Sequence, residues 1–194
     1  MKLPIYKLRI NPNDIDSGVD YVALVDNPAI ERNWMAFDAV SKLSFKIADK
    51  EKQVIAGPLM IADMPIYRRD ANGREFYVVF EKDTIEQIVH KFYREKLTDK
   101  VNVMHDKNMD IKKAYMFGSY IIDREHGIEP PKGYEDLTDG SWFGFYKIDD
   151  KVLWEDFIKT GVFKGFSVEG AFQPVSKDDE LKAKLVAILQ NIEL

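Results

Sequence analysis

Short apolar stretches separated by turn-forming residues dominate the hydrophobic pattern of this chain. Continuous or alternating apolar positions predict β-strands, whereas apolar residues at i, i+3, i+4 and i+7 predict an amphipathic helix. A Pro inside an otherwise strand-like run indicates an edge or a bulge, and such a residue interrupts residues 53–61. By these rules strands are expected over residues 3–10, 21–25, 53–61, 66–69, 76–80, 102–105, 114–123, 141–148 and 163–172.

Three segments have a helical pattern. The clearest is 83–95, which places Ile85, Ile88 and Phe92 on one face and basic residues near its end. Residues 150–160 form a shorter amphipathic pattern, and 177–192 have a single apolar stripe. We interpret 177–194 as a C-terminal amphipathic helix that covers the domain as a lid or docks a partner.

Many short strands with a few helices favour one α+β domain over residues 1–194, built on an antiparallel barrel or a strongly bent sheet.

The composition of the chain excludes several classes of function. The net charge of -5 argues against a general nucleic-acid surface, which is usually basic. The chain has no Cys, so disulfides, thiolate zinc sites and Cys nucleophiles are excluded. Neither an N-terminal signal sequence nor an apolar run of about 20 residues is found, so no membrane association is expected.

Two residues stand out as candidates for catalysis. His105 ends the apolar segment Val101–Met104 and precedes a polar loop, a common position for an acid or base. Ser167 lies in Lys164–Gly170, where flanking glycines allow the backbone to bend and a substrate to approach. A serine needs a neighbouring base to become nucleophilic. From the residues alone, a packed serine in a Gly-flanked strand and a non-catalytic loop histidine are the favoured interpretations, and catalysis is the alternative.

Metal chemistry is the rival interpretation of His105. Asp106 and Asp110 lie nearby, but no second His has the spacing of a metal ligand. The adjacent Asp149 and Asp150 precede a predicted helix and are better explained as its N-cap and first-turn charge. No phosphate-binding loop or dinucleotide motif is found, and neither a cofactor nor a metal is expected.

Three segments together resemble the phage prohead proteases of the XkdF type, relatives of the herpesvirus assemblin-like proteases. The resemblance runs in order from about residue 15 to about residue 173. It is carried by VDYVALVDNPAI at 19–30, by VNVMHD at 101–106 followed by the strand that ends at 118–122, and by GSWF at 140–143 through Leu153-Trp154 to GFSVEG at 165–170.

The resemblance implies a serine endopeptidase on a barrel of about seven antiparallel strands flanked by helices. It assigns Ser167 as the nucleophile and His105 as its base. The segment that follows the serine strand in the relatives matches residues 22–29 here, which indicates a circular permutation. The third catalytic residue would then be Asp20, with Glu169 and Asp26 as alternatives. Glu169 lies two residues from Ser167 and so points to the same face of a strand.

The function that the resemblance implies is cleavage of scaffold and major capsid precursors, and of the protease itself, during prohead maturation. The expected location is the host cytoplasm, inside the assembling prohead, where the enzyme could act as a homo-oligomer. Nucleic acid and membrane are not expected partners. The alternative is a catalytically inactive structural or scaffolding protein of the same fold, which would need neither Ser167 nor His105.

Overall fold

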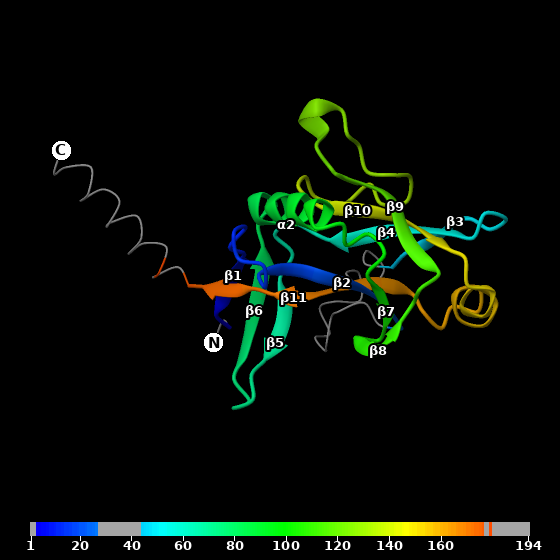
Figure 1. Cartoon of the computed structure of the whole chain (residues 1–194). Helices are drawn as coiled ribbons and strands as arrows, with labels where there is room; N and C mark the ends of the chain where they lie inside the picture. Colours follow the sequence, from blue (N-terminus) through cyan, green and yellow to red (C-terminus); the bar gives the residue numbers. More distant parts are fainter. Residues whose placement is uncertain (1–2, 27–43, 177–178, 180–194) are drawn as a thin grey trace.

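The computed structural model describes residues 3–26, 44–176 and 179, and it arranges their strands in three four-stranded sheets (Figure 1). Their orders are β12-β1-β6-β5, β3-β4-β10-β9 and β11-β2-β7-β8. The strands are β1 (Ile5–Arg9), β2 (Gly18–Val25), β3 (Lys46–Asp49), β4 (Val54–Met60), β5 (Ile66–Arg69), β6 (Glu75–Phe80), β7 (Val101–Val103), β8 (Asp106–Asp110), β9 (Ala114–Ile121), β10 (Trp142–Ile148), β11 (Gly165–Ala171) and β12 (Gln173–Val175).

The helix predicted over 83–95 is confirmed as α2 (Lys82–Arg94), which buries Ile85, Ile88 and Phe92 against the sheets. The helix predicted over 150–160 is shorter and wider than expected. It is the π-helical segment η2 (Leu153–Ile158), at whose start Asp150 accepts the N–H of Leu153 at 3.0 Å, as expected of an N-cap. The 3-10 turn η1 (Arg124–His126) follows β9. The segment 177–194 lies outside the described residues, apart from Asp179.

The N-terminal apolar segment is confirmed as an integral strand of the third sheet. β2 pairs antiparallel with β11 on one side and parallel with β7 on the other. Val22, Ala23 and Leu24 have no exposed surface. β2 therefore connects the strand that contains Ser167 with the strand that leads to His105.

The two faces of this sheet have different chemistry. Val22, Leu24, Val101 and Phe166 belong to the main hydrophobic core, which also includes the buried face of α2 and much of β10. Alternate residues of a strand point to opposite faces. Ser167, Ala23 and Asn102 are register partners across β11, β2 and β7, so their side chains lie in one row on the opposite face from this core.

The predicted barrel is wrong: the sheets are not closed, and the pairs β1–β6 and β2–β7 are parallel. The third sheet meets the second at Ser44, which bridges to Gly165. Gly57 allows this contact, because a Cβ at that position would lie 2.7 Å from the Cα of Phe45. Beyond Gly165, no described strand pairs with the outer edge of β11.

The turn and bulge predictions fit the structure. β5 and β6 form the predicted hairpin, with Gly73 at φ 79° in its turn. Pro58 lies next to a bulge in the β4–β10 pairing, as the Pro in this strand suggested. No helix in the described part of the chain is long and apolar enough to cross a membrane.

Candidate active site

Ser167 lies in the middle of β11 and its residue is 6% exposed. Gly170, one of the two glycines that flank its motif, is required by the close packing of β2 on β11. A Cβ on Gly170 would lie 1.7 Å from the carbonyl oxygen of Gly18, so this glycine lets β2 cross β11 closely. The pairing shifts between Glu169 and Gly170, so β2 bulges at Asp20.

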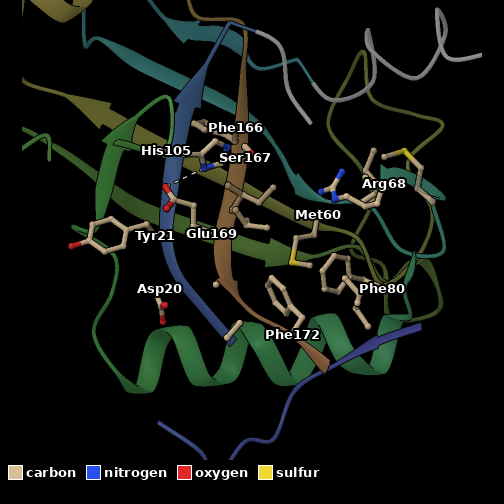
Figure 2. Close-up of a pocket in the computed structure, with 18 residues that line it drawn as sticks. Asp20, Tyr21, Met60, Arg68, Phe80, His105, Phe166, Ser167, Glu169 and Phe172 are labelled. Atoms are coloured by element: carbon tan, nitrogen blue, oxygen red, sulfur yellow. Dashed lines mark ion pairs between the residues drawn. The ribbon is translucent and has the colours of Figure 1, made fainter. Parts of the chain in front are cut away.

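His105 lies in the turn after β7 instead of ending that strand as predicted. Met104 and His105 have φ angles of 51° and 62°, and Val103 pairs with Asp106 across the turn. These are the features of a two-residue hairpin turn with left-handed backbone. Non-glycine residues in this region cost of order 1–3 kcal/mol each, and such strain is concentrated at functional sites. The turn directs the imidazole back towards the third sheet (Figure 2).

One carboxylate oxygen connects the imidazole to the sheet. Glu169 Oε1 lies 3.1 Å from His105 Nδ1 and accepts a hydrogen bond from Asn102 Nδ2 at 2.5 Å. The side chain of Glu169 is 16% exposed and that of His105 is 43% exposed, so the pair lies at the boundary between the interior and solvent. A carboxylate at Nδ1 favours the tautomer with its proton there and leaves Nε2 as the acceptor.

The small side chain of Ala23 makes this connection geometrically feasible. Ala23 lies between Ser167 and Asn102 in the row across the sheet and is completely buried. Because its side chain is only a methyl group, the longer side chain of Glu169 can pass over β2 to reach β7. Ser167 and His105 do not lie on adjacent strands, because β2 separates β11 from the His105 turn.

Ser167, His105 and Glu169 nevertheless line one cavity of about 680 Å³ (Figure 2). Figure 2 shows the first two at the same end of it, with the Glu169 carboxylate directed at the imidazole. Among the described residues there is no hydrogen bond between the Ser167 hydroxyl and His105. An unliganded catalytic pair is often looser than in its working complex.

The two other predicted acids lie elsewhere. Asp20 is exposed and lines the cavity, but Figure 2 shows its carboxylate directed towards α2 and away from His105. Asp26 is exposed at the end of β2 and is not among the lining residues. The structure therefore brings Glu169, and not Asp20 or Asp26, into contact with the imidazole.

Sequence reasoning did not single out Asn102. It is completely buried, its Nδ2 donates to Glu169, and its Oδ1 has no hydrogen-bond partner among the described residues. The available signal was a lone amide between two valines in an apolar strand. A buried amide needs partners, and an unsatisfied atom costs about 1–3 kcal/mol.

Metal binding has no support in the described residues. They contain no group of three or more His, Asp or Glu side chains arranged to hold a metal ion. Asp106 instead accepts two hydrogen bonds from Asn108, and Asp110 pairs with Lys112. The acids beside His105 in sequence thus have local partners of their own.

Comparison with known proteins identifies the family of the chain. The family model described as "Putative phage serine protease XkdF" matches residues 42–175. The matched range contains Asn102, His105, Ser167 and Glu169, and it begins after Asp20 and Asp26. No curated protein and no solved structure matches the chain. Because the family match covers well over half of the chain, the protein belongs to the XkdF family of phage serine proteases.

Proposed function

We propose that the protein is a serine endopeptidase in which Ser167 is the nucleophile, His105 the general base and Glu169 the acid that orients the imidazole. The observation that carries this proposal is the 3.1 Å contact of Glu169 Oε1 with His105 Nδ1, at the end of the cavity that Ser167 also lines. Nucleophile, base and orienting acid thus occur in the functional order of a catalytic triad.

The chemistry follows from this order. The Ser167 hydroxyl attacks the scissile carbonyl while His105 Nε2 accepts its proton, and the carboxylate of Glu169 stabilises the imidazolium that forms. His105 then gives the proton to the leaving amine, and an acyl-enzyme remains on Ser167. Water, activated by the same imidazole, hydrolyses the ester and restores the free serine.

The substrates are proposed to be the scaffold and major capsid precursors of the phage, and the protease itself, cleaved inside the assembling prohead. The family description, which names a phage serine protease, supports this assignment. The position of β2 beside β11 also supports the proposed circular permutation, because a strand from the N-terminus there occupies the place of one that would follow the serine strand.

A fluorophosphonate probe tests the nucleophile without knowledge of the substrate. Such probes phosphonylate only serines activated by a base. We expect stoichiometric labelling at Ser167, identified by mass spectrometry, and complete loss of labelling in Ser167→Ala. The matched control is Ser176→Ala, which removes a hydroxyl that does not line the cavity and is expected to label normally.

Labelling, together with cleavage assays on two variants, separates an enzyme from an inactive structural protein of this fold. Ser167→Ala and His105→Ala should both remain folded, since each removes little packing, and should both fail to cleave the precursor. Loss of a triad residue typically costs about 10⁴-fold or more in turnover. Unlabelled wild-type protein, or undiminished cleavage by Ser167→Ala, would refute the assignment.

A further inference from the structure

Arg68 brings a permanent positive charge to the candidate active-site cavity. It lies on β5, and among the described residues that line the cavity there is no Lys and no other Arg. Figure 2 shows its guanidinium directed into the cavity, at the end remote from His105. The proposed mechanism does not use this charge, so its role must be sought in what the cavity binds.

The alternation of side chains along β5 explains why Arg68 faces the cavity. Ile66 and Arg68 both line the cavity, whereas Arg69 does not, as expected when alternate residues of a strand point to the same face. Arg69 instead donates from its Nε to the carbonyl of Gly73 at 3.3 Å, within the β5–β6 hairpin. Two neighbouring arginines are thus separated by strand face, and only the first is directed at the cavity.

A backbone contact orients the guanidinium of Arg68. Its Nη1 donates to the carbonyl of Tyr67 at 2.9 Å. A guanidinium has five N–H donors in a planar fork, so one bond of this kind is compatible with binding a carboxylate through two parallel hydrogen bonds. Because Arg68 is exposed, a carboxylate can reach it without displacing residues of the core.

The side chains beside Arg68 are apolar. Figure 2 shows Met60, Phe80 and Phe172 gathered at the same end of the cavity, and Ile66 precedes Arg68 on the same face of β5. A polypeptide bound against these side chains would exclude water from the guanidinium. An ion pair is stronger where the local dielectric constant is lower, so a carboxylate held here is favoured over an uncharged amide of the same shape.

The two carboxylates that line the cavity are directed elsewhere. Glu169 contacts His105 and Asn102, and Figure 2 shows the carboxylate of Asp20 directed towards α2. Their negative charges therefore lie away from the end that contains Arg68. The charge that a substrate meets at that end is positive, which complements an acidic side chain and repels a basic one.

From this geometry we infer that Arg68 determines substrate specificity by binding the side-chain carboxylate of a Glu or Asp that lies a few residues from the bond cleaved at Ser167. The inference rests on the proposed function for the placement of that bond. Arg68 holds a substrate side chain in this scheme and takes no part in the proton transfers. The preferred substrates are therefore polypeptides with an acidic residue near the cleaved bond.

Peptide binding to the intact, full-length Ser167→Ala protein tests the inference without turnover. The probes are short fluorescein-labelled peptides of Ala, Ser and Leu that differ only at one central position, which is Glu, Gln or Lys. Both termini are capped, so only the central side chain can supply a second carboxylate beyond the dye, which all three peptides share. We expect the Glu peptide to bind at least about fivefold more tightly than the Gln peptide by fluorescence anisotropy, and the Lys peptide to bind most weakly.

Variants of the two neighbouring arginines locate the binding site. Adding Arg68→Gln should remove the advantage of the Glu peptide over the Gln peptide, and adding Arg68→Glu should reverse the order in favour of the Lys peptide. Adding Arg69→Gln should change neither, because Arg69 does not line the cavity. Both arginines are exposed, so the variants should remain folded, and thermal melting checks this.

The outcomes separate this inference from the proposed function. Absence of binding, equal binding of the Glu and Gln peptides, or equal effects of the changes at Arg68 and Arg69 would overturn the inference, and fluorophosphonate labelling of the wild type would still report on the protease. A preference for Glu that only the Arg68 variants remove supports it. If that preference occurred in a protein that the fluorophosphonate does not label, the carboxylate site would stand and the proposed protease would fail.

Discussion

At the scale of single residues, the site depends on one carboxylate oxygen that serves two partners. Glu169 Oε1 contacts both the His105 imidazole and the Asn102 amide. Asn102 comes from the same short strand that continues into the His105 turn, so the amide and the imidazole are fixed relative to each other. The carboxylate is therefore held by a buried donor before it orients the base, an arrangement that limits the freedom of all three side chains.

Glu169→Gln should lower kcat/KM by about 10²–10⁴-fold with little loss of stability, because an amide cannot stabilise the imidazolium or enforce its tautomer. Asp20→Asn is the matched control and should retain nearly full activity, since its carboxylate is directed away from His105. Cleavage assays on both variants decide between the two acids. Strong loss in Asp20→Asn with normal activity in Glu169→Gln would restore the acid that the sequence favoured.

The variant Asn102→Leu separates the role of Asn102 in positioning Glu169 from its role in the stability of the fold. Leu has a similar size and removes both the donor to Glu169 and the unpartnered Oδ1, so the change in unfolding free energy should stay within about 1–2 kcal/mol. The rate of fluorophosphonate labelling should fall by about tenfold or more, since Glu169 loses the donor that holds it. Urea denaturation and labelling kinetics measure the two effects. An unchanged labelling rate would show that Asn102 does not position the acid.

At the scale of elements, a buried cation ties α2 to the loop before β2. Lys91 is 4% exposed, and its Nζ donates to the carbonyls of Asp14, Ile15 and Ser17 while pairing with Glu95 at 3.4 Å. These contacts fix the start of β2 against the helix. A buried ammonium is tolerated only when its donors are satisfied in this way.

Lys91→Met should therefore destabilise the fold by about 2–4 kcal/mol, because the loop carbonyls lose a charged donor while the apolar stem of the side chain is kept. Arg94→Met on the same helix is the control and should cost less than about 0.5 kcal/mol, because Arg94 is exposed. Urea denaturation followed by circular dichroism gives both values. Equal stability of the two variants would contradict a structural role for the Lys91 contacts.

At the scale of the whole molecule, the N-terminal segment is an internal part of the fold. β1 lies between β12 and β6, and β2 lies between β11 and β7. All four of these neighbours are distant in sequence from the N-terminus, and the site exists only where β2 holds β11 and β7 together. Stability and activity should consequently be lost together when this segment is removed.

Deleting residues 1–26 should abolish cooperative unfolding and fluorophosphonate labelling. The deletion removes an inner strand from each of two sheets and exposes the apolar residues that packed against Val22 and Leu24, each worth roughly 1.5–3 kcal/mol of burial. Deletion of residues 1–3, which precede the contact of Pro4 with Tyr77, is the control. Calorimetry on both proteins checks this, and a cooperative transition in the longer deletion would show that β2 is dispensable.

The sequence by itself determined most of the local structure and the two central chemical candidates. Periodicity located α2, the β5–β6 hairpin and the strands around Ser167, because apolar spacing and turn residues act over a few neighbours. The Gly-flanked serine and the His after an apolar strand were likewise visible in the residues. Where the expected strand or helix ends were wrong, as at His105 and at η2, the cause is a turn or a π-helical geometry that short-range patterns do not encode.

Only the tertiary structure decided how these elements meet. The contact of Glu169 with His105 depends on the register of β11, β2 and β7 and on the bulge at Asp20, where one extra residue changes which side chains face the site. The junction of the second and third sheets depends on where Ser44 bridges to Gly165. Residues 102 and 169 are far apart in the chain, and no periodicity in either segment carries the pairing between them, so the choice of Glu169 over Asp20 and Asp26, and its amide partner, became visible only in the folded molecule.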